Sequence, residues 1–314
     1  MGNIAKRKGV TDMLQGKWLR GVVALCTLML VTVSVPGLAV GSEGHGHAGR
    51  AAHKVGILLV AFGSSDASAQ VSFDTIDRKV AAAYPGTAVR WAYTSHIIRE
   101  KLAGQGKALD SPAVALARML DERFTHVVVQ SLHTIGGAEY HDLLRTVNGF
   151  KAMGGFAKLV LGDPLMATQA DMAAIVAAIA GVIPKERRKN EAVVLMGHGT
   201  HHPANAFYAA LMFQLQLQDP NFFVGTVEGY PDVDLIKAQM RAKGIKKAYL
   251  MPFMSVAGDH AKNDMAGDQP ESWKSIFTNA GIQCVPVMKG TAEYDAFVDI
   301  WVGHIGNAMK AMGV

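Results

Sequence analysis

Cysteine is nearly absent from this sequence, which contains only Cys26 and Cys284. Cys26 falls inside an N-terminal segment that we expect to be removed, so the mature chain would keep Cys284 alone. A single thiol cannot form an internal disulfide, and it excludes structural zinc sites built from several cysteines. The folded protein must therefore be held together by its hydrophobic core.

Charge is also sparse, at 18% of the 314 residues, while 50% are hydrophobic. This balance is typical of a globular protein, and the length is sufficient for two domains. The formal net charge is +5, but residues 1–41 hold five Lys or Arg and one acid, so the remainder is close to neutral. The sequence therefore gives no support for nucleic-acid binding.

The first 41 residues have the layout of a secretory signal peptide. Basic residues precede an apolar stretch at 21–35, and small residues at 36–41 offer a cleavage site. The alternative is an uncleaved membrane anchor, although the apolar stretch is short for a spanning helix. We predict a periplasmic protein without a membrane segment after cleavage, in which residues 42–54 form a flexible mature N-terminus.

Apolar runs alternate with segments of helical periodicity through the rest of the chain. This alternation predicts an α/β protein with parallel, right-handed βαβ units. The charged segment PKERRKN at 184–190 interrupts the pattern, so we predict two similar domains, at 55–184 and 185–314. The predicted strands are 55–62, 88–94, 127–132, 157–161, 193–196, 222–227, 248–253 and 283–287, and the helices include 67–83, 111–124, 168–183, 204–217, 234–243 and 294–312.

The two halves also resemble each other in residues. VAFGSS at 60–65 aligns with LMGHGT at 195–200, and VVVQSLHTIGGAE at 127–139 aligns with AYLMPFMSVAGDH at 248–260, which places Glu139 opposite His260. Neither half has a GxGxxG or P-loop after its first strand, so a nucleotide-binding function is weakly supported. Two similar α/β domains predict a cleft between them.

Each of the first three predicted strands of the second half ends in a residue able to bind a metal. His198 lies in MGHGTHHP, Glu228 in VEGYP, and His260 in SVAGDH. Parallel strands present their carboxyl ends on one edge, so these side chains are expected to converge. Two imidazoles and a carboxylate suit a divalent transition metal such as Co²⁺ or Fe²⁺ and leave coordination positions open.

The motifs MGHGTHHPAN, VEGYP, PFMSVAGDHAKNDMAG and VQSLHTIGGAEYHDLL resemble those of the anaerobic cobalt chelatases, which insert Co²⁺ into sirohydrochlorin. The resemblance covers the chain from Val55 onward. It implies the class II chelatase fold, related to ferrochelatase, with two α/β domains around a cleft. It further implies that His198 and His260 ligate the metal beside Glu228, and that no nucleotide is required.

A chelatase must also remove two pyrrole protons and hold a flat polycarboxylate tetrapyrrole. His198, His260, Glu228 and Glu139 are the candidate catalytic bases. Phe62, Tyr93 and Met254 are candidate apolar contacts, and Lys262, Arg90 and Arg99 are candidate carboxylate partners. Because the export signal is unexpected for such an enzyme, the alternative is a non-catalytic periplasmic carrier of metal or tetrapyrrole. In either case we expect a homo-oligomer.

His96 follows the second predicted strand, in SHIIREKL, away from the other candidates. The simpler interpretation is a residue at the start of a helix. The alternative is an axial ligand to a haem, shared between subunits, because an exported tetrapyrrole protein would be able to encounter haem.

Overall fold

The computed structural model describes residues 53–314 of the chain. The predicted signal peptide and most of the predicted flexible segment lie outside these residues. None of the helices within residues 53–314 combines the length and the apolar character needed to cross a membrane. At the start of the described chain, Lys54 donates its backbone N–H to Thr125 Oγ1 at 3.0 Å.

The first half contains a four-stranded parallel sheet in the order β2-β1-β3-β4. Strands β1 and β3 are buried on both faces, as their uninterrupted apolar runs predict. The elements of this half are β1 (Val55–Ala61), α1 (Gln70–Ala83), β2 (Ala88–Tyr93), α2 (His96–Gly104), α3 (Pro112–Asp121), β3 (His126–Ser131), α4 (Ala138–Met153), β4 (Lys158–Gly162) and α5 (Gln169–Val182), with the short 3₁₀ turn η1 (Ala67–Ala69) before α1.

The second half repeats this topology, with a parallel sheet in the order β6-β5-β7-β8. The matching strand order confirms the predicted α/β class and the repeat seen in the sequence. Its elements are β5 (Ala192–Gly199), η2 (Pro203–Asn205), α6 (Ala206–Gln218), β6 (Phe222–Glu228), α7 (Val233–Ala242), β7 (Lys247–Pro252), η3 (Ala261–Met265), α8 (Trp273–Asn279), β8 (Gln283–Pro286), η4 (Thr291–Glu293) and α9 (Asp295–Met312).

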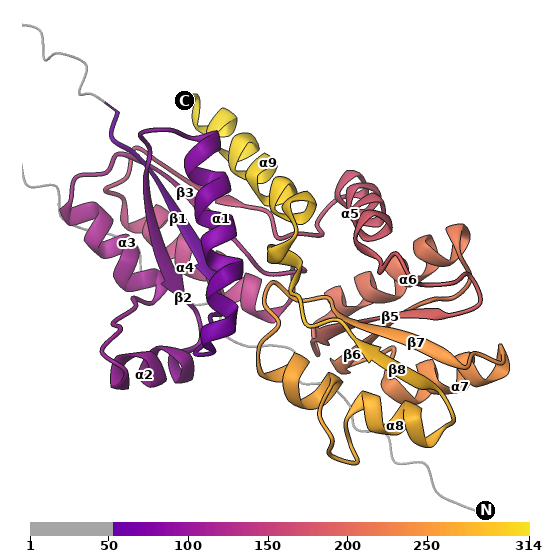
Figure 1. Cartoon of the computed structure of the whole chain (residues 1–314). Helices are drawn as coiled ribbons and strands as arrows, with labels where there is room; N and C mark the ends of the chain where they lie inside the picture. Colours follow the sequence, from indigo (N-terminus) through magenta and orange to yellow (C-terminus); the bar gives the residue numbers. More distant parts are fainter. Residues whose placement is uncertain (1–52) are drawn as a thin grey trace, which may run out of the picture. The chain divides into compact units, whose positions relative to one another are not determined.

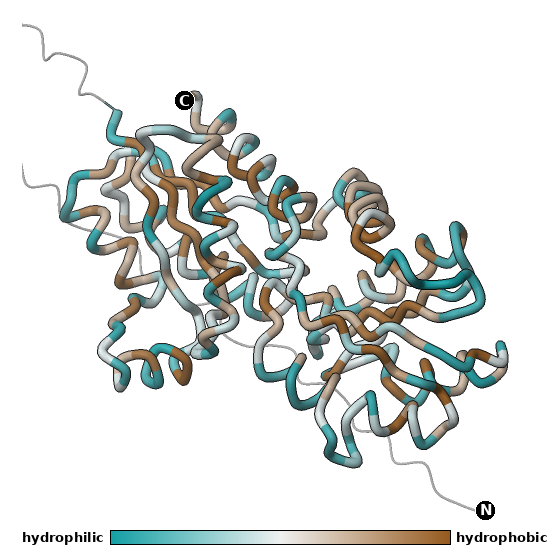
Figure 2. The backbone as a smooth tube through the Cα atoms, viewed as in Figure 1, coloured by the Kyte–Doolittle hydropathy of each residue, from teal (hydrophilic) through white to brown (hydrophobic). Residues whose placement is uncertain are grey.

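Helices cover both faces of each sheet (Figure 1). In the first half, α3 and α4 pack on one face, and α1 packs on the other together with α9. In the second half, α7 and α8 cover one face, and α5 and α6 cover the other. Figure 2 shows the consequence: the strands are the most hydrophobic segments, and the connections at the ends of the sheets are more hydrophilic.

Helix α9 departs from the linear division of the chain. It comes last in the sequence, yet it contacts β3, β4 and α1 of the first half (Figure 1). Phe297, Val298 and Trp301 are almost completely buried there. The predicted boundary at 184/185 falls between the two sheets, but it assigns α9 to the second half although this helix packs mainly on the first, with Phe297 also contacting Phe253 of the second half.

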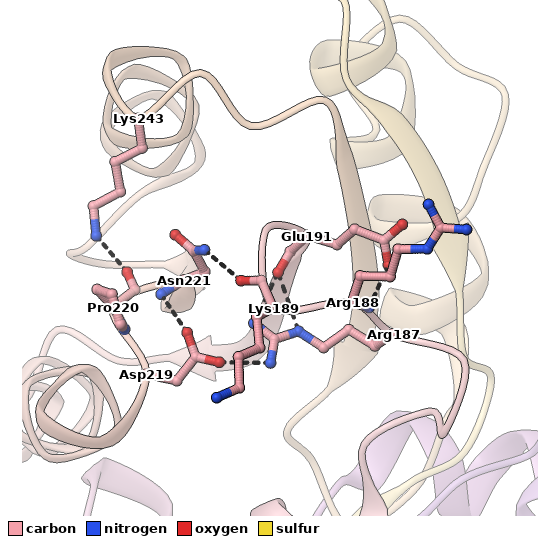
Figure 3. Close-up of polar contacts among 8 residues, drawn as sticks. All are labelled: Arg187, Arg188, Lys189, Glu191, Asp219, Pro220, Asn221 and Lys243. Atoms are coloured by element: carbon pink, nitrogen blue, oxygen red, sulfur yellow. Dashed lines mark hydrogen bonds and ion pairs between the residues drawn. The ribbon is translucent and has the colours of Figure 1, made fainter.

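The charged segment that marked this boundary is fastened to the second half (Figure 3). Arg187 donates to Asp219 Oδ2 at 2.6 Å and to the Glu191 carbonyl at 2.8 Å. Asn221 donates to the Lys189 carbonyl at 2.8 Å, and Lys243 donates to the Pro220 carbonyl. These contacts tie residues 187–191 to the connection between α6 and β6, so β5 begins at a fixed position.

Candidate functional site

Two glycines shape the turn that carries His198 at the end of β5. A Cβ atom on Gly197 would lie 2.3 Å from the Tyr208 ring, and one on Gly199 would lie 2.0 Å from the Glu228 carbonyl oxygen. Gly199 also has a φ of +88°, which side chains other than glycine rarely adopt. Gly197 therefore lets Tyr208 of α6 pack against β5, and Gly199 lets β6 approach it, while His198 carries the functional side chain of the GHG motif.

His198 and His260 are held in the same tautomer by different partners. His198 Nδ1 lies 3.0 Å from the Gly199 carbonyl oxygen, and His260 Nδ1 lies 2.5 Å from Asp264 Oδ2. A carbonyl or an ionised carboxylate only accepts, so both Nδ1 atoms carry the proton. In the neutral ring, Nε2 then keeps the lone pair with which imidazole binds a metal.

The two imidazoles lie close together although they come from different strand ends. Their ring centroids are 4.8 Å apart, and the ring planes are nearly perpendicular at 84°. His260 immediately precedes the π-helical turn η3, an irregularity that is frequent at functional sites. This turn also places Asp264 one turn after His260, where it orients the ring.

The two carboxylates of the predicted site share a cavity with these histidines. Glu228, the last residue of β6, is exposed, and Glu139, in the first turn of α4, is half-buried. Burial raises the pKa of Glu139; His198 partly offsets this effect, while Asp142 and Glu228 add to it. Within residues 53–314, no three His, Cys, Asp or Glu side chains lie close enough to form a metal-binding cluster. The pair of histidines is therefore the part of the predicted triplet that the fold brings together directly.

The cavity has a volume of about 710 Å³ and is lined by both halves of the chain. Such a volume is within the range of small-molecule sites. Apolar side chains including Phe62, Ile98 and Met254 supply part of the wall, and Phe62 is 44% exposed at this surface. The lining combines an apolar surface with titratable groups, which suits a ligand that has both apolar and ionisable parts.

His133 is a further titratable residue in the wall, at the end of β3. Burial lowers the pKa of its imidazole to about 4. Its Nδ1 lies 2.9 Å from Ser131 Oγ, and its Nε2 lies 3.4 Å from Glu139 Oε2 without the geometry of a hydrogen bond. His133 therefore stands neutral at neutral pH behind the carboxylate of Glu139.

Comparison with known proteins places the chain in a family. Residues 55–310 match the family model described as cobalt chelatase (CbiK). A sirohydrochlorin cobaltochelatase CbiKC of Nitratidesulfovibrio vulgaris is 45% identical over 259 residues, which cover 82% of this chain and 92% of the relative. A sirohydrochlorin cobaltochelatase of Salmonella typhimurium is 37% identical, covering 82% of this chain and 97% of the relative.

The chain belongs to the CbiK family of cobalt chelatases. Solved structures support the chelatase fold of this CbiK protein. SirB from Bacillus subtilis, solved with Fe³⁺, gives a TM-score of 0.55 at 13% identity, covering 81% of this chain and 95% of SirB. A multi-domain Deinococcus radiodurans protein with structural similarity to chelatases gives 0.53 at 14% identity, covering 80% of this chain and 54% of its own.

Two of the residues that the sequence suggested as substrate contacts, Tyr93 and Arg90, lie away from the cavity in this CbiK protein. Tyr93 is 6% exposed and packs against Phe73 and Trp91, so it does not line the cavity. Arg90 pairs with Glu122 at 2.9 Å on the surface. Neither side chain reaches the cavity because β2 directs Tyr93 into the core and Arg90 to the outer surface of the sheet.

His96 is the first residue of α2 and is exposed. Ser95 caps the helix, accepting from the Ile98 N–H at 3.3 Å. The position agrees with the simpler interpretation, a residue at a helix start. His96 does not line the cavity that holds His198 and His260, so a haem ligated by His96 would occupy a different site.

Sequence reasoning missed Asp264, which orients His260, and the role of His133 beside Glu139. The first carried a signal, since an acid four residues after a histidine faces it across one helical turn. The contact between His133 and Glu139 depends on how the chain leaves β3 and enters α4, and no spacing rule in the sequence describes that path.

Proposed function

We propose that this protein inserts Co²⁺ into sirohydrochlorin without a nucleotide. The observation that carries the proposal is the pair of imidazoles, His198 and His260, whose Nε2 lone pairs are available at the wall of a large, partly apolar cavity. The matching activity of the curated relatives supports it. Fe²⁺ is a second candidate metal, because imidazole and carboxylate ligands suit both ions.

The metal step follows from the ligand set. Two neutral imidazoles displace water from the incoming ion while leaving coordination positions for the pyrrole nitrogens. Glu228, on the same cavity wall, supplies a carboxylate that offsets the charge of the ion. Because the site holds few protein ligands, the ion is bound loosely enough to pass to the macrocycle.

The proton step requires two acceptors, since sirohydrochlorin loses two pyrrole protons as the metal enters. Glu139 accepts a proton more readily than an ordinary glutamate, because burial raises its pKa. The Nε2 atoms of His198 and His260 become available as acceptors once the metal has left them. Phe62 and Met254 would contact the ring during this exchange.

The test follows sirohydrochlorin absorbance with Co²⁺ or Fe²⁺ in excess and without ATP. Wild type is expected to complete many turnovers, and His198→Ala and His260→Ala to lose activity while keeping the circular dichroism of wild type. His53→Ala, an exposed histidine outside the cavity, is the matched control. Near wild-type rates in both cavity variants would refute the assignment. Stoichiometric binding without turnover would instead identify a carrier of metal or tetrapyrrole.

Export to the periplasm, assembly into a homo-oligomer and haem ligation by His96 are separate proposals. Export rests on the layout of residues 1–41 and is tested by locating the protein in fractionated cells and sequencing its mature N-terminus. Size-exclusion chromatography with light scattering tests oligomerisation. After incubation with haem, a Soret band that changes on His96→Ala would support ligation by His96. A band that is the same in wild type and in His96→Ala would exclude it.

A further inference from the structure

The cavity presents an electrostatic problem for the substrate proposed above. Sirohydrochlorin carries acetate and propionate side chains around its ring, yet four carboxylates line the wall: Asp66, Glu139, Glu228 and Asp259. Lys101 is the one Lys or Arg among the lining residues that the structure describes. Like charges close together repel each other. The carboxylates of a polyanionic ligand should therefore avoid the acidic wall, and the position of Lys101 should determine where one of them binds.

The other cations near the cavity are engaged within the protein. Lys262 pairs with Asp66, and Arg99 donates to the carbonyls of Tyr93 and Thr94 at 2.7 Å and 3.2 Å. These residues were candidate carboxylate partners on sequence grounds. Lys101, by contrast, has no acidic partner within 4.0 Å among residues 53–314.

Helix α2 places Lys101 beside two apolar residues on the same face. Ile97 and Ile98 precede Lys101 by four and three residues, so the three side chains adjoin one another and all line the cavity. Ile97 is 53% exposed, so its side chain is accessible to a ligand in the cavity. A lysine can lay its methylene stem along such a surface and hold its ammonium group at the edge.

We propose that this face of α2, Ile97, Ile98 and Lys101, is the subsite that orients the tetrapyrrole by its rim. Lys101 binds one peripheral carboxylate, and the two isoleucines contact the adjoining part of the macrocycle. The inference rests on the proposed function and assigns a substrate-binding residue to it. Lys101 makes the cavity selective for a tetrapyrrole with carboxylates at that edge over one without them.

The test compares Lys101→Met with Lys107→Met, which removes the same charge from an exposed site outside the cavity. Binding of metal-free sirohydrochlorin is measured at equilibrium by fluorescence, and KM and kcat are measured with Co²⁺. Lys101→Met is expected to raise Kd and KM by about two- to fivefold, the range for a solvent-accessible ion pair, and to leave kcat unchanged. Lys101→Arg should restore much of the affinity, and Lys107→Met should match wild type.

The octamethyl ester of sirohydrochlorin, in the same detergent for all proteins, separates the carboxylate contact from other effects. Wild type and Lys101→Met should bind this ester equally. Equal binding of the acid by Lys101→Met and Lys107→Met would overturn the inference, as would an equal loss for acid and ester. Failure of the proposed function would look different, because wild type would then show no turnover with either metal. The Kd of metal-free sirohydrochlorin for wild type and Lys101→Met would still test the role of Lys101.

Discussion

At the scale of single residues, the site depends on hydrogen bonds that fix which ring nitrogen is free. His198 uses its own turn, because its Nδ1 donates to the Gly199 carbonyl. His260 relies on a side chain, Asp264, whose contact is shorter and carries charge. Charge-assisted hydrogen bonds are stronger than neutral ones. Because the partner of His260 is a side chain, one substitution can remove it, whereas the backbone carbonyl that orients His198 is present whatever the side chain.

Asp264→Asn tests this contact. We expect it to weaken Co²⁺ binding by about 10- to 100-fold, as replacement of a carboxylate behind a ligating histidine commonly does. Titration of the metal-free protein with Co²⁺, followed by visible absorbance, measures the effect. Asp268→Asn, an exposed carboxylate paired with Lys274, is the control. Unchanged Co²⁺ affinity in Asp264→Asn would show that the pair has no part in metal binding.

His133 predicts a pH dependence of stability. Its pKa is lowered to about 4 by burial, whereas the unfolded chain takes up a proton near 6.5. Stability is therefore complete above pH 6.5 and falls as the pH drops from 6.5 toward 4, by about 3 kcal/mol at most. Urea unfolding between pH 7 and 4 should show this loss in wild type and in the exposed control His96→Gln, and a smaller loss in His133→Gln. If the free energy of unfolding fell equally with decreasing pH in all three proteins, His133 would not be the source of the loss.

At the scale of elements, α9 is locked to α5 by a buried polar contact. His304 Nε2 lies 2.9 Å from Asp171 Oδ1, and its Nδ1 lies 3.1 Å from the Asp163 carbonyl oxygen. Asp171 also closes the capping box of α5 with Thr168. Burial raises the pKa of Asp171, but the bonds from His304 and Thr168 outweigh burial and hold it below its ordinary value. This contribution is present above the unfolded pKa near 3.8 and is lost as the pH falls through the folded pKa.

His304→Leu should therefore destabilise the protein by about 3–5 kcal/mol at pH 7, because it leaves a buried carboxylate without its partner. Urea unfolding gives the change in the free energy of unfolding. Lys274→Ala breaks an exposed pair with Asp268 and should leave the free energy of unfolding nearly unchanged. A loss in His304→Leu no greater than in Lys274→Ala would mean that the contact does not stabilise α9.

Element by element, the sequence predicted all eight strands that the structure describes within residues 53–314, because their apolar runs are separated by helical periodicity. It predicted no element between the strands at 248–253 and 283–287, where the structure has the π-helical turn η3 and helix α8. Helix α8 has only 7 residues, which is too few to display two helical periods. The turn η3 depends on hydrogen bonds that a residue pattern does not specify.

At the scale of the described chain, the two sheets share one core. A single cluster of buried side chains joins Ile57 and Leu59 of β1 to Val193 and Leu195 of β5. Trp301 of α9, 1% exposed, belongs to the same cluster. Residues 53–314 should therefore unfold together, although they contain two sheets.

Trp301→Ala tests this cooperativity. Removing the indole should destabilise the protein by about 3–5 kcal/mol, and hydrogen exchange should report the same loss of protection in β1 and β3 as in β5 and β7. Ile97→Ala, on the exposed face of α2, is the control and should leave exchange in all four strands unchanged. Loss confined to β1 and β3 would show that the halves unfold separately.

The sequence by itself determined the α/β class, the repeated order of elements along the chain and the positions of His198, Glu228 and His260 at strand ends. Those features follow from hydrophobic periodicity and from the rule that parallel strands expose their carboxyl ends on one edge. The tertiary structure alone decided that α9 packs on the first sheet and that His133 lies next to Glu139. It also decided that Lys101 lines the cavity, whereas Lys262 and Arg99 bind other groups of the protein. Such contacts join residues distant in sequence, and their partners are chosen by shape and burial, which no local pattern of residues records.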